Sequence, residues 1–123
     1  MRIWWRSVRF ALQGLAFAWR NERNMRIHLC LALAALLLVA LLDVPLVQAL
    51  FVLLSILLVL TGELFNTALE KTIDATGAKP HPLAKAAKDC AAAAVLLCAL
   101  FAVVVGIAVF GPLILEGPAW RWK

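Results

Sequence analysis

Residues 62–74 read GELFNTALEKTID and directly follow a long apolar run that starts at Leu46. At about 100° per residue of helix, the polar side chains of this segment fall in one narrow stripe, made of Glu63, Asn66, Glu70 and Asp74. Glu63 lies where the helix is still expected to be in lipid. An ionised carboxylate there is costly unless it is paired, protonated or bound to a metal. We therefore expect this acidic stripe to be a functional site.

The composition around the stripe is that of an integral membrane protein. The chain has 123 residues, of which 65% are hydrophobic and only 15% are charged, and its mean hydropathy is +0.95. A soluble domain of this size has too little interior to bury that fraction of apolar side chains. The fold class that follows is an all-α integral membrane protein with one membrane domain.

Three apolar segments reach or exceed the length needed to cross the ~30 Å hydrocarbon core at 1.5 Å per residue. We expect transmembrane helices at residues 25–42, 46–71 and 83–115. Pro45 is well placed to open the second of them. The connection at 72–82 contains GAKPHP, whose two prolines and glycine forbid a continuous helix. Residues 116–123 are expected to form an interfacial tail, with tryptophans at headgroup level.

The N-terminal residues 1–24 are expected to form an amphipathic surface helix and a short lead-in to the first span. Its polar and cationic side chains share one face: Arg2, Arg6, Arg9, Gln13 and Arg20. Trp and Leu side chains occupy much of the rest. This pattern is typical of a helix that lies in the headgroup layer of an anionic membrane.

The distribution of positive charge predicts the orientation. Arginines precede the first span, and lysines lie between the second and third, whereas the Asp43-Val44-Pro45 turn has neither. By the positive-inside rule, the N-terminus and the 72–82 loop are cytoplasmic.

The stripe and its neighbours suggest a magnesium–nucleotide site at a membrane surface. Glu63 is either a general base or a protonated glutamate bonded across a helix interface. Glu22, at the mouth of the first span, and Glu70 are hard oxygen ligands, and Mg²⁺ prefers one or two carboxylates with nucleotide phosphates completing its shell. Asn66 lies one turn from both Glu63 and Glu70 and is placed to orient either. Lys88 is either a phosphate-binding cation or a salt-bridge partner.

Taken together, these motifs resemble those of the bacterial diacylglycerol kinase and undecaprenol kinase family. The resemblance rests on E-x-x-N-x-x-x-E-x-x-x-D at 63–74, HPLAKAAKD at 81–89, and Gly14, Trp19 and Asn21 before Glu22. It covers nearly the whole chain, including the order of surface helix, two spans, loop and third span. Common soluble nucleotide-binding motifs, such as the P-loop, are absent from the sequence.

The resemblance implies a homotrimer whose active sites lie at subunit boundaries. It implies that Glu63 is the catalytic base, supported by Asn66, and that Glu22 and Glu70 hold the Mg²⁺ that bridges the phosphates of ATP, the co-substrate. The implied ATP contacts are Glu22, Glu70, Asp74, His81, Lys88, Asp89 and an N-terminal arginine. Because Ile3 stands at the matching position, Arg2 or Arg6 must substitute, and we take Arg6. The implied lipid contacts are Trp19, Asn24 and His28.

The lipid substrate follows from E-x-N-x-x-x-H at 22–28, which resembles the undecaprenol kinase branch. The diacylglycerol kinase branch tends to carry an acidic residue in place of His28. We therefore expect undecaprenol to be converted to undecaprenyl phosphate at the bacterial inner membrane, with diacylglycerol, giving phosphatidic acid, as the alternative. A small proton-coupled transporter would also place a glutamate in the membrane, and a holin-like structural protein would leave the stripe unexplained.

Overall fold

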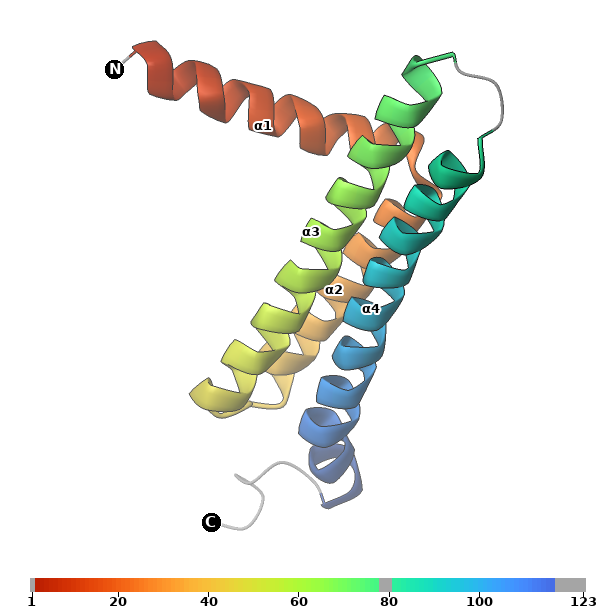
Figure 1. Ribbon diagram of the computed structural model, residues 1–123. Helices are drawn as coiled ribbons and strands as arrows, with labels where there is room; N and C mark the ends of the chain where they lie inside the picture. Colours follow the sequence, from red (N-terminus) through yellow and green to blue (C-terminus); the bar gives the residue numbers. More distant parts are fainter. Residues whose placement is uncertain (1, 78–80, 117–123) are drawn as a thin grey trace.

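The computed structural model describes residues 2–77 and 81–116, and in this part of the chain it is entirely helical. Its elements are α1 (Arg2–Asn21), α2 (Arg23–Leu41), α3 (Leu46–Ala75) and α4 (Pro82–Glu116). Helices α2, α3 and α4 run side by side as a bundle, and α1 meets one end of it and extends away at a steep angle (Figure 1). We call this end of the bundle the α1 end.

Helices α2, α3 and α4 are each long and apolar enough to cross a membrane. This confirms the prediction of an all-helical chain with three candidate spans. Large apolar side chains cover their outward faces, such as Leu33 on α2, Leu57 on α3 and Leu97 on α4. Exposed leucines on all three helices suit lipid as the surrounding solvent.

The helix ends differ in detail from the predicted ones. Helix α3 continues to Ala75, so the predicted loop at 72–82 begins as helix, and Gly77, with φ 59°, ends it in the left-handed conformation that glycine adopts without strain. At about 1.5 Å per residue, its 30 residues span about 45 Å, so α3 projects beyond a bilayer core. The predicted tail at 116–123 lies almost wholly outside the described residues.

Helix α3 is the centre of the bundle, because both α2 and α4 pack against it. Far from α1, the core is apolar and consists of Val52, Val105 and Val109 with partly buried neighbours. Toward α1, the buried set includes Met25 but also the polar Glu63 and Thr67. The bundle therefore changes from an apolar interior to a polar one along its length.

We expect Met25→Ala to destabilise the protein by about 2–5 kcal/mol, because Met25 is 0% exposed and its truncation leaves a cavity. Unfolding by added SDS in mixed micelles measures this change. Leu33→Ala on the same helix is the control and should cost clearly less, since Leu33 is 67% exposed. Equal losses for the two variants would contradict the packing described here.

Candidate active site at the α1 end

The acidic stripe of α3 runs from the interior of the bundle to its surface. Glu63 is 2% exposed, Asn66 and Glu70 are half-buried, and Asp74, three turns beyond Glu63, is exposed. The stripe therefore offers a buried carboxylate at its inner end and solvent-accessible ones at its outer end. Glu22, Glu70 and His28 all lie within electrostatic reach of Glu63, so groups from α2 and α3 converge on it.

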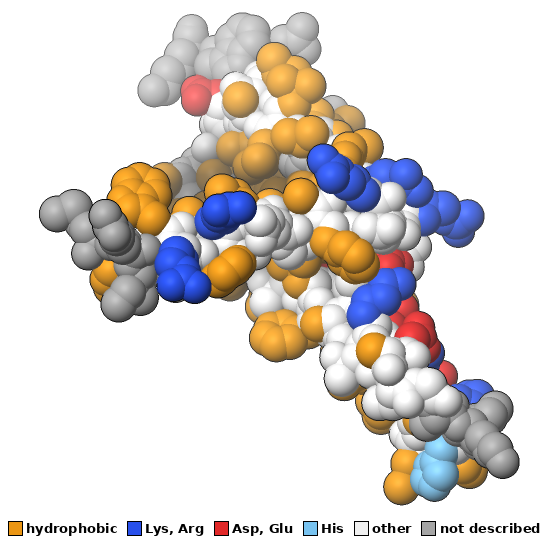
Figure 2. Space-filling view, turned by 90° about the horizontal axis from the view of Figure 1, so that it is seen from above, with side chains coloured by type: hydrophobic (Ala, Val, Ile, Leu, Met, Phe, Trp, Pro, Cys, Tyr) orange, Lys and Arg blue, Asp and Glu red, His pale blue; other side chains and the backbone are white. Residues whose placement is uncertain are grey.

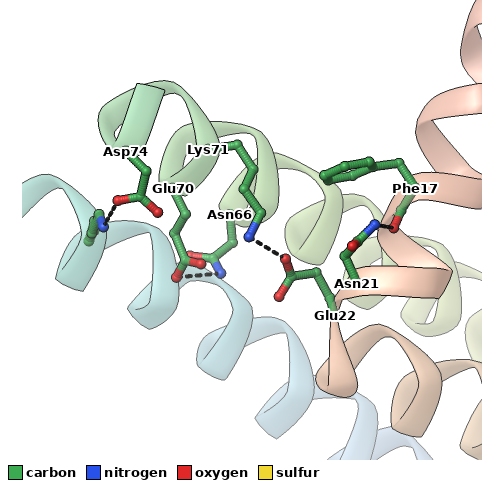
Figure 3. Close-up of polar contacts among 8 residues, drawn as sticks. Phe17, Asn21, Glu22, Asn66, Glu70, Lys71 and Asp74 are labelled. Carbon is green, nitrogen blue, oxygen red and sulfur yellow. Dashed lines mark hydrogen bonds and ion pairs between the residues drawn. The ribbon is translucent and has the colours of Figure 1, made fainter. Parts of the chain in front are cut away.

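Glu22 joins the site because of the break between α1 and α2. It is the N-cap residue of α2, with extended backbone angles of φ −109° and ψ 119°, and its side chain makes no capping hydrogen bond. Instead, the Lys71 ammonium of α3 lies 2.9 Å from Glu22 Oε1 (Figure 3). The ammonium is at hydrogen-bonding distance from this buried oxygen and is the cation that balances its charge. The break in the chain thus points a carboxylate at α3.

Asn66 and Glu70 form a second pair within the stripe. Asn66 Nδ2 donates to Glu70 Oε1 at 3.3 Å, one helical turn away (Figure 3). The other amide atom, Asn66 Oδ1, is buried and has no hydrogen-bond partner. A buried oxygen without a donor is uncommon in proteins and leaves acceptor capacity for a ligand.

At the outer end of the stripe, Lys88 of α4 donates to Asp74 Oδ1 at 2.5 Å, so the structure brings both residues together across the two helices. Asp89 points elsewhere and accepts from Lys85, one turn earlier on α4. His81 lies at the start of α4, where its Nδ1 accepts the backbone N–H of Leu83 at 3.1 Å. The predicted roles of His81 and Asp89 toward a nucleotide stay predictions.

The N-terminal residues predicted to contact the nucleotide or the lipid lie less close together than the residues of the acidic stripe. Arg6 is exposed and belongs to the half of α1 that extends away from the bundle (Figure 1). Seen from above, Lys and Arg side chains spread widely, whereas most of the visible acidic side chains follow one row (Figure 2). Trp19 and Asn24 are exposed near the α1–α2 junction. Contact of Arg6 with a nucleotide, and of Trp19 and Asn24 with lipid, stay predictions.

Below the stripe lies an apolar cavity of about 240 Å³, bounded by α2, α3 and α4. His28 and Ser55 are its polar lining residues, and Leu60 places its upper part within one turn of Glu63. Ser55 satisfies its hydroxyl by donating to the carbonyl of Val52 at 2.8 Å. The cavity could hold apolar chain, with His28 as a polar group between it and the stripe.

Two residues of the site were missed by sequence reasoning. Lys71 belongs by sequence to the lysines between the second and third spans, but it lies four residues after Thr67, a spacing that places it on the same face of the helix. Thr67 is buried on the same face, and its Oγ1 has no hydrogen-bond partner. Its spacing of four residues from Glu63 could have placed it there.

The donor set fits Mg²⁺ that arrives with a nucleotide. Within residues 2–77 and 81–116, no three His, Cys, Asp or Glu side chains gather closely enough to hold a metal by themselves. Glu22 and Glu70 supply two carboxylates, and Asn66 Oδ1 adds an unpartnered oxygen. Mg²⁺ is usually held by one or two carboxylates plus substrate phosphates, so this incomplete protein shell suits a metal–nucleotide complex.

The sequence profile of the prokaryotic diacylglycerol kinase family matches residues 9–110. The chain is 45% identical over 101 residues to a Synechocystis protein named diacylglycerol kinase, covering 81% of this chain and 58% of that relative. It is 37% identical over 107 residues to an undecaprenol kinase of Bacillus subtilis, covering 87% of each. A diacylglycerol kinase of Escherichia coli is 32% identical over 99 residues, covering 80% of this chain and 81% of the relative.

The fold and the comparisons define a membrane-embedded lipid kinase, a phosphotransferase that acts on an alcohol group. The chain belongs to the prokaryotic diacylglycerol kinase family. Membership sets aside the transporter and the holin-like protein as alternatives.

We expect Lys88→Met to raise the KM for ATP about tenfold, because a charge-assisted contact to phosphate is lost. The denaturation midpoint should stay unchanged, since the exposed Asp74–Lys88 ion pair contributes little to stability. Steady-state kinetics and SDS denaturation measure the two effects. Lys85→Met removes the same charge from α4 and is the control. A loss of stability that parallels the loss of activity would assign Lys88 to structure alone.

Proposed function

We propose that this protein transfers the γ-phosphate of ATP to the hydroxyl of undecaprenol. The observation that carries the proposal is the position of Glu63, a buried carboxylate between an apolar cavity and the half-buried Glu70 and exposed Asp74 farther along α3. A lipid alcohol whose tail occupies apolar surroundings would present its hydroxyl at this boundary. The nucleotide would reach the same point from the solvent side.

Glu63 is the proposed general base. Its burial keeps water away from the reacting hydroxyl, and its carboxylate accepts the proton as the oxygen attacks phosphorus. Asn66, one turn along the helix, orients the stripe through its bond to Glu70. In-line phosphoryl transfer depends mainly on positioning and charge stabilisation, which is what such a fixed row of side chains provides.

Glu22 and Glu70 are the residues proposed to hold Mg²⁺. When bound, the metal neutralises negative charge on the phosphates. Lys88 contacts the phosphates as a point charge on a flexible stem, released from Asp74. Asp74, His81, Asp89 and Arg6 complete the proposed nucleotide contacts, while Trp19, Asn24 and His28 contact the lipid.

We place the protein in the bacterial inner membrane as a homotrimer, with the N-terminus and the active site facing the cytoplasm. The arginines of α1 and of the first turns of α2, together with the absence of Lys and Arg from the turn at Asp43, support the orientation. Exposed Trp4 and Trp5 beside the arginines of α1 support a helix in the headgroup layer. Small side chains such as Ala91 and Ala94, which line a groove between α3 and α4, support close helix contacts between subunits.

Diacylglycerol is the second candidate substrate. Relatives named diacylglycerol kinase are 45% and 32% identical to this chain, so the comparisons do not separate the two lipids. The choice of undecaprenol rests on His28, which lines the cavity and stands at the position where the sequence pattern distinguishes the two branches.

Transfer of label from ATP to lipid by the purified protein in mixed micelles tests the choice of substrate. Undecaprenol and diacylglycerol are offered separately, each with and without Mg²⁺. We expect Mg²⁺-dependent label in undecaprenyl phosphate to exceed that in phosphatidic acid. Predominant phosphatidic acid would reverse the choice of lipid and leave the mechanism in place. Transfer to neither lipid by folded protein would overturn the proposed function.

We expect Glu63→Gln to lower kcat by at least about 10²-fold, because the amide cannot accept the proton. Folding and oligomeric state should be unchanged, since glutamine is nearly isosteric. Size-exclusion chromatography in detergent and the micelle assay measure these outcomes. Asp43→Asn is the matched control at the far end of the bundle, and its activity should equal that of the unaltered protein. Full activity of Glu63→Gln would exclude Glu63 as the base.

A further inference from the structure

Lys71 is the cation that faces the proposed metal ligands. Its ammonium lies 2.9 Å from Glu22 Oε1, and its charge also interacts with Glu70 and Asp74 on its own helix (Figure 3). The side chain of Lys71 is 45% exposed, whereas that of Glu22 is 20% exposed. Lys71 is therefore the more solvent-accessible member of the pair.

The arrangement of Glu22 is not explained by the needs of the helix. The side chains that ordinarily cap a helix by accepting a hydrogen bond from its first turn are Ser, Thr, Asp and Asn, and the longer Glu is not among them. Glu22 makes no such bond, and its Oε1 faces the Lys71 ammonium of α3 instead. Lys71 thus balances the charge of Glu22, and no capping bond holds the carboxylate to α2.

An ion pair of this kind is easily exchanged. The Lys71 side chain is partly exposed, so solvent weakens the pair, and lysine is a strongly hydrated point charge on a long flexible stem. A divalent cation competes effectively for Glu22 once phosphates complete its shell. The freed ammonium then has new negative charge within reach on those phosphates.

We propose that Lys71 is a positioning residue that occupies Glu22 until the metal–nucleotide complex binds, and that it then transfers to the phosphates. This rests on the proposed function, since it takes Glu22 and Glu70 as the ligands of Mg²⁺. Free divalent metal must displace Lys71 and offers it no new partner. Metal carried by a nucleotide also displaces Lys71, but the nucleotide phosphates give its ammonium a new partner. Lys71 therefore makes the site selective for the complex over the free ion.

Binding of Mn²⁺ without nucleotide, followed by electron paramagnetic resonance in detergent micelles, tests the proposal. We expect Lys71→Met to bind Mn²⁺ at least about threefold more tightly than the unaltered protein, because a competing cation has been removed. Lys71→Arg should behave like the unaltered protein. Lys85→Met, which loses an equivalent lysine–carboxylate pair on α4, should leave Mn²⁺ affinity unchanged.

The gain in Mn²⁺ affinity must act through Glu22. In a Glu22→Gln background, Lys71→Met should therefore produce less than half of the gain. An equal gain there, or no gain in the single variant, would overturn the proposal.

Kinetics provide a second test. We expect the KM for Mg–ATP to rise about fivefold in Lys71→Met, with a smaller change in kcat, because a phosphate contact is lost. An unchanged or lower KM would overturn the transfer of Lys71 to the phosphates. Failure of the proposed function would show differently, as absence of lipid phosphorylation by the unaltered protein while the Mn²⁺ measurements stand.

Discussion

The buried carboxylate of Glu63 is the constraint on which the rest of the structure depends. In a helix that is otherwise apolar for most of a bilayer's thickness, a carboxylate is tolerated only where other protein groups surround it. Helix α3 therefore has to be central, with α2 and α4 packed on it, and its polar face has to run outward from Glu63 toward water. The length of α3 follows as well, because the stripe needs helix beyond the bilayer core to carry Glu70 and Asp74.

The two ends of the bundle are held together by different interactions. Far from α1, valines form a small apolar core, which holds the helices together without polar contacts. At the α1 end, ion pairs join α2 to α3 and α3 to α4 through Lys71 and Lys88. Both pairs are partly exposed to solvent, which weakens them, so they leave the carboxylates able to exchange partners when a charged ligand arrives. A site built from strong buried pairs would be stable but closed to the nucleotide.

Much of this could be predicted from residue order. The three spans, the break at the 77–82 segment and the grouping of Glu63, Asn66 and Glu70 follow from hydropathy and helical spacing, which depend only on local sequence. The hydrogen bond between Asn66 and Glu70 can be predicted in the same way, because both residues lie on one helix, one turn apart. The partner of Glu22 was not predictable in this way, because Lys71 is far along the chain and belongs to a different helix. The apolar cavity beside His28 could not be predicted from the sequence either, since residues of three helices form it.

The sequence by itself determined that this is a helical membrane protein with an acidic face at one end of its second span, because the cost of burying charge in lipid acts on each residue wherever the chain goes. Only the tertiary structure decided which lysine forms an ion pair with which carboxylate of another helix. Lys71 pairs with Glu22 and Lys88 pairs with Asp74, because these ion pairs depend on distances of a few ångströms between helices and on how the break at Glu22 turns the chain.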